Sequence, residues 1–152
     1  MGKVLINILH LMFRATRPLT LGVRCILHTD NKSVMLVRHT YVTGWHLPGG
    51  GVEVGEECET TIIREVAEET NVNLAQSPCF FGIYLNSEVS HRDHVILYHS
   101  DNWEKDNNLS LNKLEIAECS MFELTELPVD IDPSTLQRLN EWRGLKKPTL
   151  IW

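Results

Sequence analysis

Gly50 to Val72 is the stretch of sequence that decides the fold, and it reads GGVEVGEECETTIIREVAEETNV. Its second part, Glu56 to Asn71, is rich in Glu, Arg and Ala and contains no Gly or Pro, which predicts a helix. Asn71 stands where a left-handed residue would end that helix, a position that Asn accepts better than most residues. The glycines 49–51 before the helix predict a tight loop with a bare backbone.

Three glutamates of the predicted helix lie close together on its surface. At about 100° per residue, Glu65, Glu68 and Glu69 fall within an arc of roughly 100°. Carboxylates at this spacing repel one another, and a hard divalent cation such as Mg²⁺ would offset the repulsion. A solvated acidic face is the competing interpretation. The neighbouring arc is apolar and can pack on a core, with Cys58, Ile62 and Val66.

The glycine loop complements these carboxylates. A backbone without side chains can approach a phosphate group closely and can present a carbonyl oxygen to a metal ion. Hydrolysis of a phosphate linkage needs cations that neutralise its oxygens and acidify an attacking water. Because the sequence contains neither GxGxxG nor GK[ST], other phosphate-binding loops fit less well.

The spacing of these residues resembles the Nudix box of the MutT-like hydrolases. That box has Gly, five residues, Glu, seven residues, and then Arg-Glu-apolar-x-Glu-Glu-x-Gly-apolar. The one departure is Asn71 in place of the second Gly, and Asn tolerates the positive φ expected there. The box covers residues 50–72 and matches at Gly50, Glu56, Arg64, Glu65, Val66, Glu68, Glu69 and Val72.

The resemblance implies a role for each matching polar residue. Glu65, Glu68 and Glu69 would bind Mg²⁺, with Mn²⁺ as a substitute, and one of them would help to activate water. The backbone carbonyl of Gly50 would be a further metal ligand. A supporting ion pair would form between two more residues of the box, Glu56 and Arg64.

Other candidate residues lie outside the box. The resemblance implies a later acidic metal ligand, which Glu115 matches best, with Glu118 and Asp93 as alternatives. It also implies a basic residue on the substrate phosphate, and Arg38 at a strand end or Arg24 in mid-strand could take that role; a surface salt bridge is the alternative. Trp45 and Tyr41 flank the glycine loop and could stack on a base, although either could instead pack in the core.

The rest of the chain predicts short strands and a closing helix. Asp30-Asn31-Lys32 predicts a turn between the first two strands. The mixture of strands and helices with antiparallel returns favours an α+β fold. The resemblance implies the Nudix fold, an α/β/α sandwich with a mixed sheet, as one domain over residues 1–152. The expected strands are Leu19–His28, Ser33–His39, Trp45–Leu47, Cys79–Asn86, His94–His99 and Glu115–Phe122, and the expected helix is Pro133–Trp142.

Composition narrows the kind of partner. The 152 residues carry a formal net charge of −6, which argues against binding a nucleic-acid polymer. Four scattered cysteines without a CxxC pair indicate reduced thiols and a cytoplasmic protein. The apolar run Val4 to Phe13 is too short to span a membrane and recurs at helical spacing. We therefore expect an N-terminal helix over residues 1–14 that docks or forms a homodimer.

The expected function is metal-dependent hydrolysis of a diphosphate linkage in a small nucleotide-like substrate. Nucleoside triphosphates, ADP-ribose, nucleotide sugars and dinucleoside polyphosphates remain open, because the box encodes the chemistry and not the specificity. One alternative is isomerisation of isopentenyl diphosphate, which would need further Cys and His residues at the metal. Another alternative is a module that binds a nucleotide without cleaving it.

Overall fold

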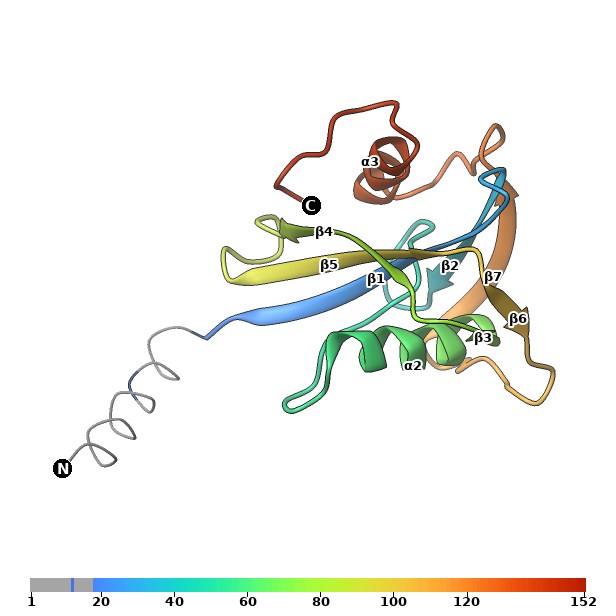
Figure 1. Ribbon diagram of the computed structural model, residues 1–152, viewed down its shortest axis with the longest axis horizontal. Helices are drawn as coiled ribbons and strands as arrows, with labels where there is room; N and C mark the ends of the chain where they lie inside the picture. The colour runs from blue at the N-terminus through green and yellow to red at the C-terminus, as the bar shows by residue number, and fades with distance from the viewer. Residues whose placement is uncertain (1–11, 13–17) are drawn as a thin grey trace.

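A five-stranded sheet lies between two helices (Figure 1). The computed structural model describes residue 12 and residues 18–152. The predicted α+β sandwich with a mixed sheet is confirmed. The predicted N-terminal helix over residues 1–14 lies outside the described residues apart from Met12. A single domain over residues 1–152 stays a prediction.

The central sheet has the strand order β4-β5-β1-β2-β7. Strand β1 (Thr20–Thr29) pairs in parallel with β5 (Asp93–Ser100) and antiparallel with β2 (Ser33–His39). The edges are β4 (Cys79–Leu85), which is antiparallel to β5, and β7 (Ile116–Glu123), which is antiparallel to β2. The sheet is therefore mixed, and its central strands are covered on both faces.

The turn between β1 and β2 has a left-handed backbone. Asp30 has φ 46° and Asn31 has φ 55°, values that these two residue types accept more readily than most. Consecutive left-handed residues suit the twist of a tight antiparallel hairpin. The predicted turn is present, and it aligns Thr29 with Ser33 across the two strands.

Helix α2 (Cys58–Thr70) begins two residues later than predicted. Glu57 has an extended backbone at φ −81° and ψ 139°, so the first acidic residues of the predicted helix lie before it. Asn71 ends the helix in the left-handed conformation at φ 56°, as predicted. The chain then forms β3 (Val72–Leu74), which pairs with β6 (Trp103–Lys105) in a small second sheet that the sequence did not indicate.

Alternating side chains of β1 pack on the two layers. Val23 and Cys25 join the core cluster that contains Ile62 of α2. Ile26 joins the opposite cluster with Leu139 of α3 (Pro133–Trp142). The sheet thus holds α2 on one face and α3 on the other (Figure 1).

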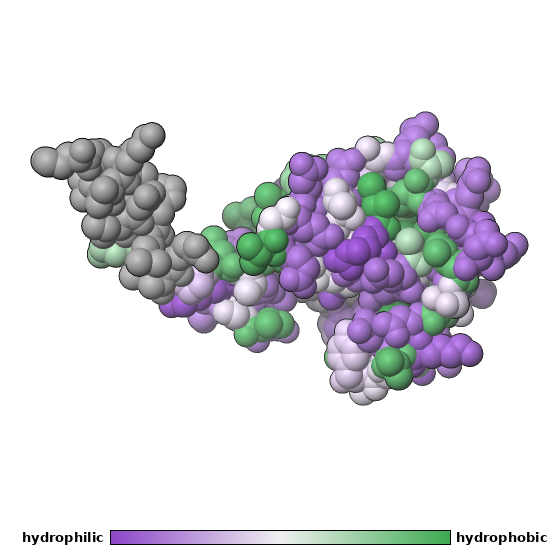
Figure 2. Space-filling view, turned by 90° about the horizontal axis from the view of Figure 1, so that it is seen from below, coloured by the Kyte–Doolittle hydropathy of each residue, from purple (hydrophilic) through white to green (hydrophobic). Residues whose placement is uncertain are grey.

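The face that carries α2 is largely hydrophilic in the space-filling view (Figure 2). This agrees with a helix that buries one side against the sheet and exposes charged residues on the other. Among residue 12 and residues 18–152, no helix has the length and apolar character needed to cross a membrane.

Candidate active site

A buried hydrogen bond joins the glycine loop to helix α2. The backbone N–H of Gly49 donates to Oε2 of Glu69 at 2.8 Å, and the Glu69 side chain is buried. Gly49 has φ 140°, and a Cβ there would overlap the backbone carbonyl of Val23. Only glycine fits this position, so the close approach of the loop to Glu69 depends on it.

Gly50 packs directly on the second carboxylate of the helix. A Cβ at Gly50 would overlap the Glu65 side chain, whose exposed fraction is 16%. The Gly50 carbonyl accepts a 2.9 Å hydrogen bond from the backbone N–H of Val23, which ties the loop to β1. A carbonyl oxygen has two lone pairs, so this one can still accept a second partner.

Arg64 holds three carboxylates of the box. Its guanidinium donates to both carboxylate oxygens of Glu56, at 3.0 Å and 3.2 Å. The same side chain donates to Glu65 at 2.7 Å and to Glu68 at 3.4 Å. Hydrogen bonds from Arg64 are the main reason that the pKa of Glu56 falls to about 2. Arg64 therefore fixes the orientation of the carboxylates beside the loop.

Burial raises the pKa of both Glu65 and Glu69. Burial raises the pKa of Glu69 to about 7; the Gly49 hydrogen bond and Arg24 oppose the shift, while Glu65 and Glu115 add to it. Burial also raises the pKa of Glu65, and Arg64 opposes that shift. Their ionised forms are therefore disfavoured, and a bound cation would stabilise both.

His39 lies beside this pair as a neutral side chain. Its Nδ1 is 3.8 Å from Oε1 of Glu69, and both side chains are almost fully buried. Burial lowers the pKa of His39 to about 4, with Arg24 and His46 acting in the same direction. The histidine thus adds no positive charge near neutral pH.

A cavity of about 710 Å³ opens in front of these residues. It brings together seven of the candidate residues named from the sequence, which come from several separate segments of the chain. They are Arg24, Tyr41, Gly50, Glu65, Glu69, Asp93 and Glu115.

Three other acidic candidates are placed differently. The Glu68 side chain is 55% exposed and contacts Arg64. Asp93 lines the cavity but accepts hydrogen bonds from Thr20 at 2.6 Å and from Asn86 at 2.8 Å. Glu118 lies 3.9 Å from Arg38, outside the lining of the cavity. Among the described residues, Glu115 is thus the acidic residue beyond the box that lines the cavity and accepts no side-chain hydrogen bond.

Arg38 and Trp45 contact each other instead of lining this cavity. The Arg38 guanidinium lies 4.8 Å from the centroid of the Trp45 ring and donates to Asp130 at 2.8 Å. Trp45 is 5% exposed and packs edge-on against Phe122. Their contacts with a substrate stay predictions. Arg38 forms an ion pair with Asp130, and Trp45 packs in a core cluster.

A second cavity of about 680 Å³ adjoins the first. Both are lined by Arg24, Tyr41, Asn86 and Val89. Trp152 also lines the second cavity. Sequence reasoning missed Asn86 and Trp152, because neither belongs to a motif and each reaches the cavity only through the three-dimensional fold.

The donor atoms at the first cavity suit a hard cation. Within the described ranges, 12 and 18–152, no group of three or more His, Cys, Asp or Glu side chains is already arranged around one metal position. Glu65 and Glu69 nevertheless offer carboxylate oxygens with raised pKa, and Gly50 offers a carbonyl oxygen. Oxygen ligands of this kind fit Mg²⁺ or Mn²⁺ in chemistry.

Comparison with known proteins identifies related sequences. The family model described as NUDIX domain matches residues 18–142. An ADP-ribose pyrophosphatase from Methanocaldococcus jannaschii is 34% identical over 73 residues, which cover 47% of this chain and 43% of that protein. The chain spans half or less of the length of the first curated relatives that it matches, between 40% and 50%.

Solved structures share the fold. The MutT NUDIX hydrolase from Burkholderia pseudomallei superposes with a TM-score of 0.68 at 18% identity, covering 81% of this chain and 97% of that chain. The NUDIX domain of Shewanella oneidensis NrtR, complexed with ADP ribose, gives a TM-score of 0.67 at 21% identity and covers 87% and 91%. At these identities the likeness shows the fold alone.

Proposed function

The chain belongs to the NUDIX domain family, and from this premise we propose that it hydrolyses a diphosphate linkage in a small nucleoside diphosphate derivative. One observation carries the proposal: Glu65 and Glu69 face the glycine loop on the wall of a cavity of about 710 Å³. A relative named as an ADP-ribose pyrophosphatase supports the same class of reaction.

We assign a divalent cation to this wall. Glu65 and Glu69 would hold it, with Glu68, Glu115 and the Gly50 carbonyl as further oxygen ligands. When bound, Mg²⁺ or Mn²⁺ would neutralise diphosphate oxygens and acidify a water molecule. Arg64 orients the carboxylates of Glu65 and Glu68 for that purpose, and Glu56 holds Arg64 in place.

Arg24 is proposed to bind the substrate phosphate. It lines both cavities, and its Nη1 is buried without a hydrogen-bond partner among residue 12 and residues 18–152. An unpaired buried donor is costly, and a phosphate oxygen would satisfy it with a charge-assisted hydrogen bond. One of Glu65, Glu68 and Glu69 then accepts the proton of the attacking water. The products are a nucleoside monophosphate and either phosphate or a phosphorylated remainder.

A substrate screen tests the proposal. Purified protein is incubated with Mg²⁺ or Mn²⁺ and nucleoside triphosphates, ADP-ribose, nucleotide sugars and dinucleoside polyphosphates, and the products are identified by mass spectrometry. We expect cleavage within the diphosphate of at least one of them. Ligand-dependent thermal stabilisation without any cleavage would favour a binding module instead.

The isomerase alternative lacks a suitable nucleophile at the described site. Cys58 packs partly buried against the core cluster of α2. Conversion of isopentenyl diphosphate to its isomer without release of phosphate would restore that alternative. We also propose a cytoplasmic location, which the four free cysteines suit, and a homodimer.

A further inference from the structure

The second cavity has a wall made by the segment that follows α3. Trp152 lies in this wall. The second cavity adjoins the first one, which Glu65 and Glu69 line, at Arg24, Tyr41 and Asn86. A substrate with its diphosphate at the glycine loop would therefore extend its other end toward Trp152. This step rests on the proposed function.

The segment is held to the edge of the central sheet. The backbone N–H of Leu85 donates to the Leu150 carbonyl at 2.9 Å, and the N–H of Trp152 donates to the Leu85 carbonyl at 3.0 Å. Leu85 and Ile151 form a parallel bridge. The segment is thus held beside the end of β4 by one bridge, and this bridge fixes the backbone position of Trp152.

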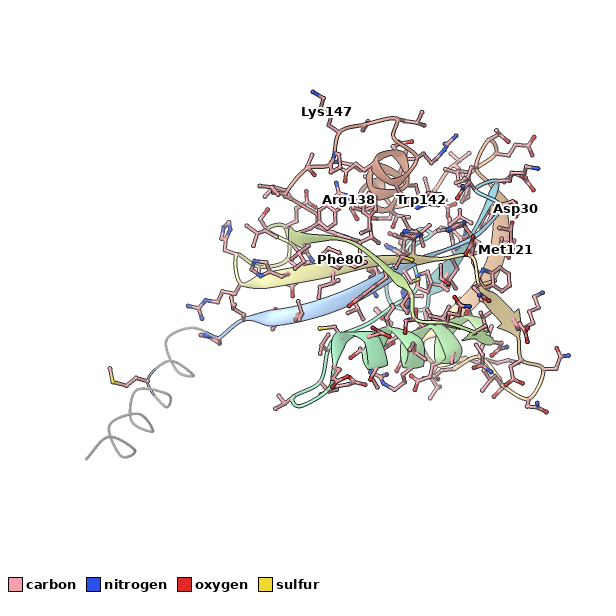
Figure 3. All side chains as sticks on the ribbon, viewed as in Figure 1. Asp30, Phe80, Met121, Arg138, Trp142 and Lys147 are labelled. Carbon is pink, nitrogen blue, oxygen red and sulfur yellow. The ribbon has the colours of Figure 1, made fainter. Side chains whose placement is uncertain are left out.

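A buried ion pair fastens the same segment from the α3 side. Arg138 and Glu141 lie 2.8 Å apart, and neither side chain is exposed. Arg138 also donates to the Ile151 carbonyl at 2.6 Å and to Thr149 Oγ1 at 3.0 Å, while Glu141 accepts from the Thr149 backbone N–H at 3.2 Å. Figure 3 shows Arg138 on the side of α3 that faces the sheet. A buried pair is costly unless further hydrogen bonds satisfy it, and these go to residues 149–151.

The Trp152 ring is oriented by two neighbours. Tyr84 packs against it edge-on, with ring centroids 5.6 Å apart and an interplanar angle of 76°. The Arg138 guanidinium lies 5.6 Å from the ring centroid. The side chain remains partly exposed, and it lines the second cavity. A fixed indole beside an open cavity offers a flat surface on which another ring can stack.

We propose that Trp152 recognises the nucleobase of the substrate by stacking, and that the Arg138–Glu141 pair positions it through Thr149 and Ile151. Stacking between a base and an aromatic side chain is worth a change of roughly 5- to 150-fold in affinity. Trp152 thereby distinguishes nucleotides from diphosphates that carry no base.

Enzyme kinetics test the proposal with two substrates. One is a nucleoside diphosphate derivative that the protein cleaves, and the other is its abasic analogue with the same ribosyl diphosphate. We expect Trp152→Ala to raise KM for the nucleotide by about 5-fold or more and to leave kcat/KM for the abasic analogue unchanged. Trp152→Phe should retain most of the affinity. Leu150→Ala is the matched control, because Leu150 lies in the same segment, is 80% exposed and does not line the cavity.

Two outcomes would overturn the proposal. An unchanged KM for the nucleotide in Trp152→Ala excludes recognition of the base. An equal loss on both substrates shows a structural role instead. Calorimetry with a methylene-bridged analogue, which cannot be cleaved, keeps the test independent of the proposed hydrolysis: weaker binding by Trp152→Ala supports the proposal, and equal binding contradicts it. Thr149→Val, which removes the hydroxyl that Arg138 contacts, should give a smaller effect in the same direction.

Discussion

The backbone N–H of Gly49 and the carboxylate of Glu69 meet at 2.8 Å although they are 20 positions apart in the sequence. This buried contact joins the loop to the helix, and the packing of Gly50 on Glu65 reinforces it. The glycines and the glutamates of the box therefore form one unit. A substitution on either side should disturb the same cavity.

Glu69→Gln should abolish most activity without unfolding the protein. Gln keeps the shape and can still accept the hydrogen bond from Gly49, but it cannot ionise or bind a cation strongly. We expect kcat to fall by about 100-fold or more, as when a group that acts in the transition state is removed. The melting temperature should change little. Burial raises the pKa of Glu69 to about 7 and so disfavours its ionised form, and Gln removes that charge.

Glu59→Gln is the matched control for that experiment. Glu59 lies on the same helix, in its first turn, and is exposed to solvent. Its kcat should equal that of the wild type. Normal turnover in Glu69→Gln would contradict the assignment of Glu69 to the site.

Gly50→Ala should lower activity by displacing Glu65. An added methyl group would overlap the Glu65 carboxylate, so this side chain must leave the position in which Arg64 holds it. We expect kcat/KM to fall by at least about 10-fold, since misplaced catalytic groups are costly. Val54→Ala is the control, because Val54 lies in the same loop, is fully exposed and lines neither of the two cavities. Equal activity in the two variants would show that the position of Glu65 is unimportant.

The box could be predicted from the sequence because its geometry is local. The spacing of Glu65, Glu68 and Glu69 is set by one helix, and Asn71 ends that helix through its own backbone preference. Both features depend on residues within a few positions of one another. The mixed sheet between helices followed from the resemblance to a known fold.

The different burial of the box glutamates could not be predicted, because it depends on how the helix packs against the sheet and the glycine loop. Glu69 is buried against the glycine loop whereas Glu68, its neighbour in sequence, is more than half exposed. The same holds for Trp45, whose burial comes from Phe122 on a strand far along the chain. Trp152 carried no signal at all, because its position is set by contacts with β4 and α3.

Protonation of His28 should destabilise the protein in acid. His28 is 4% exposed, and neither ring nitrogen has a hydrogen-bond partner in the part of the chain that the structure describes. Burial lowers its pKa below 6.5; Asp101 and Asp30 oppose the shift, and His99 adds to it. The unfolded chain therefore binds a proton at His28 more readily than the folded protein does. The contribution of neutral His28 to the free energy of unfolding is present above pH 6.5 and is lost as the pH falls toward the folded-state pKa.

His28→Phe tests this dependence, because it keeps a ring beside Trp142 and removes the titrating group. The urea midpoint of each protein is measured at about pH 8 and about pH 5. The drop between the two should be smaller in the variant. The difference between the proteins is the measured quantity, since His39 and His99 titrate in both. Equal drops would show that His28 does not contribute.

Arg24 and Arg38 should differ in their effect on the substrate, although the sequence offered both for the same role. Arg24 lines both cavities, and its Nη1 has no hydrogen-bond partner among the described residues. Arg38 is already bound to Asp130, and its guanidinium lies over the Trp45 ring. Arg24→Ala should lower kcat/KM by roughly 10- to 100-fold, the usual value of a hydrogen bond to a charged group. Arg38→Ala should leave kcat/KM near that of the wild type and lower the melting temperature slightly, because it loses a partly exposed ion pair. Steady-state kinetics and thermal denaturation of both variants separate these effects. If Arg38→Ala alone weakens the reaction, the phosphate contact belongs to Arg38, and the cavity beside the glycine loop does not hold the diphosphate.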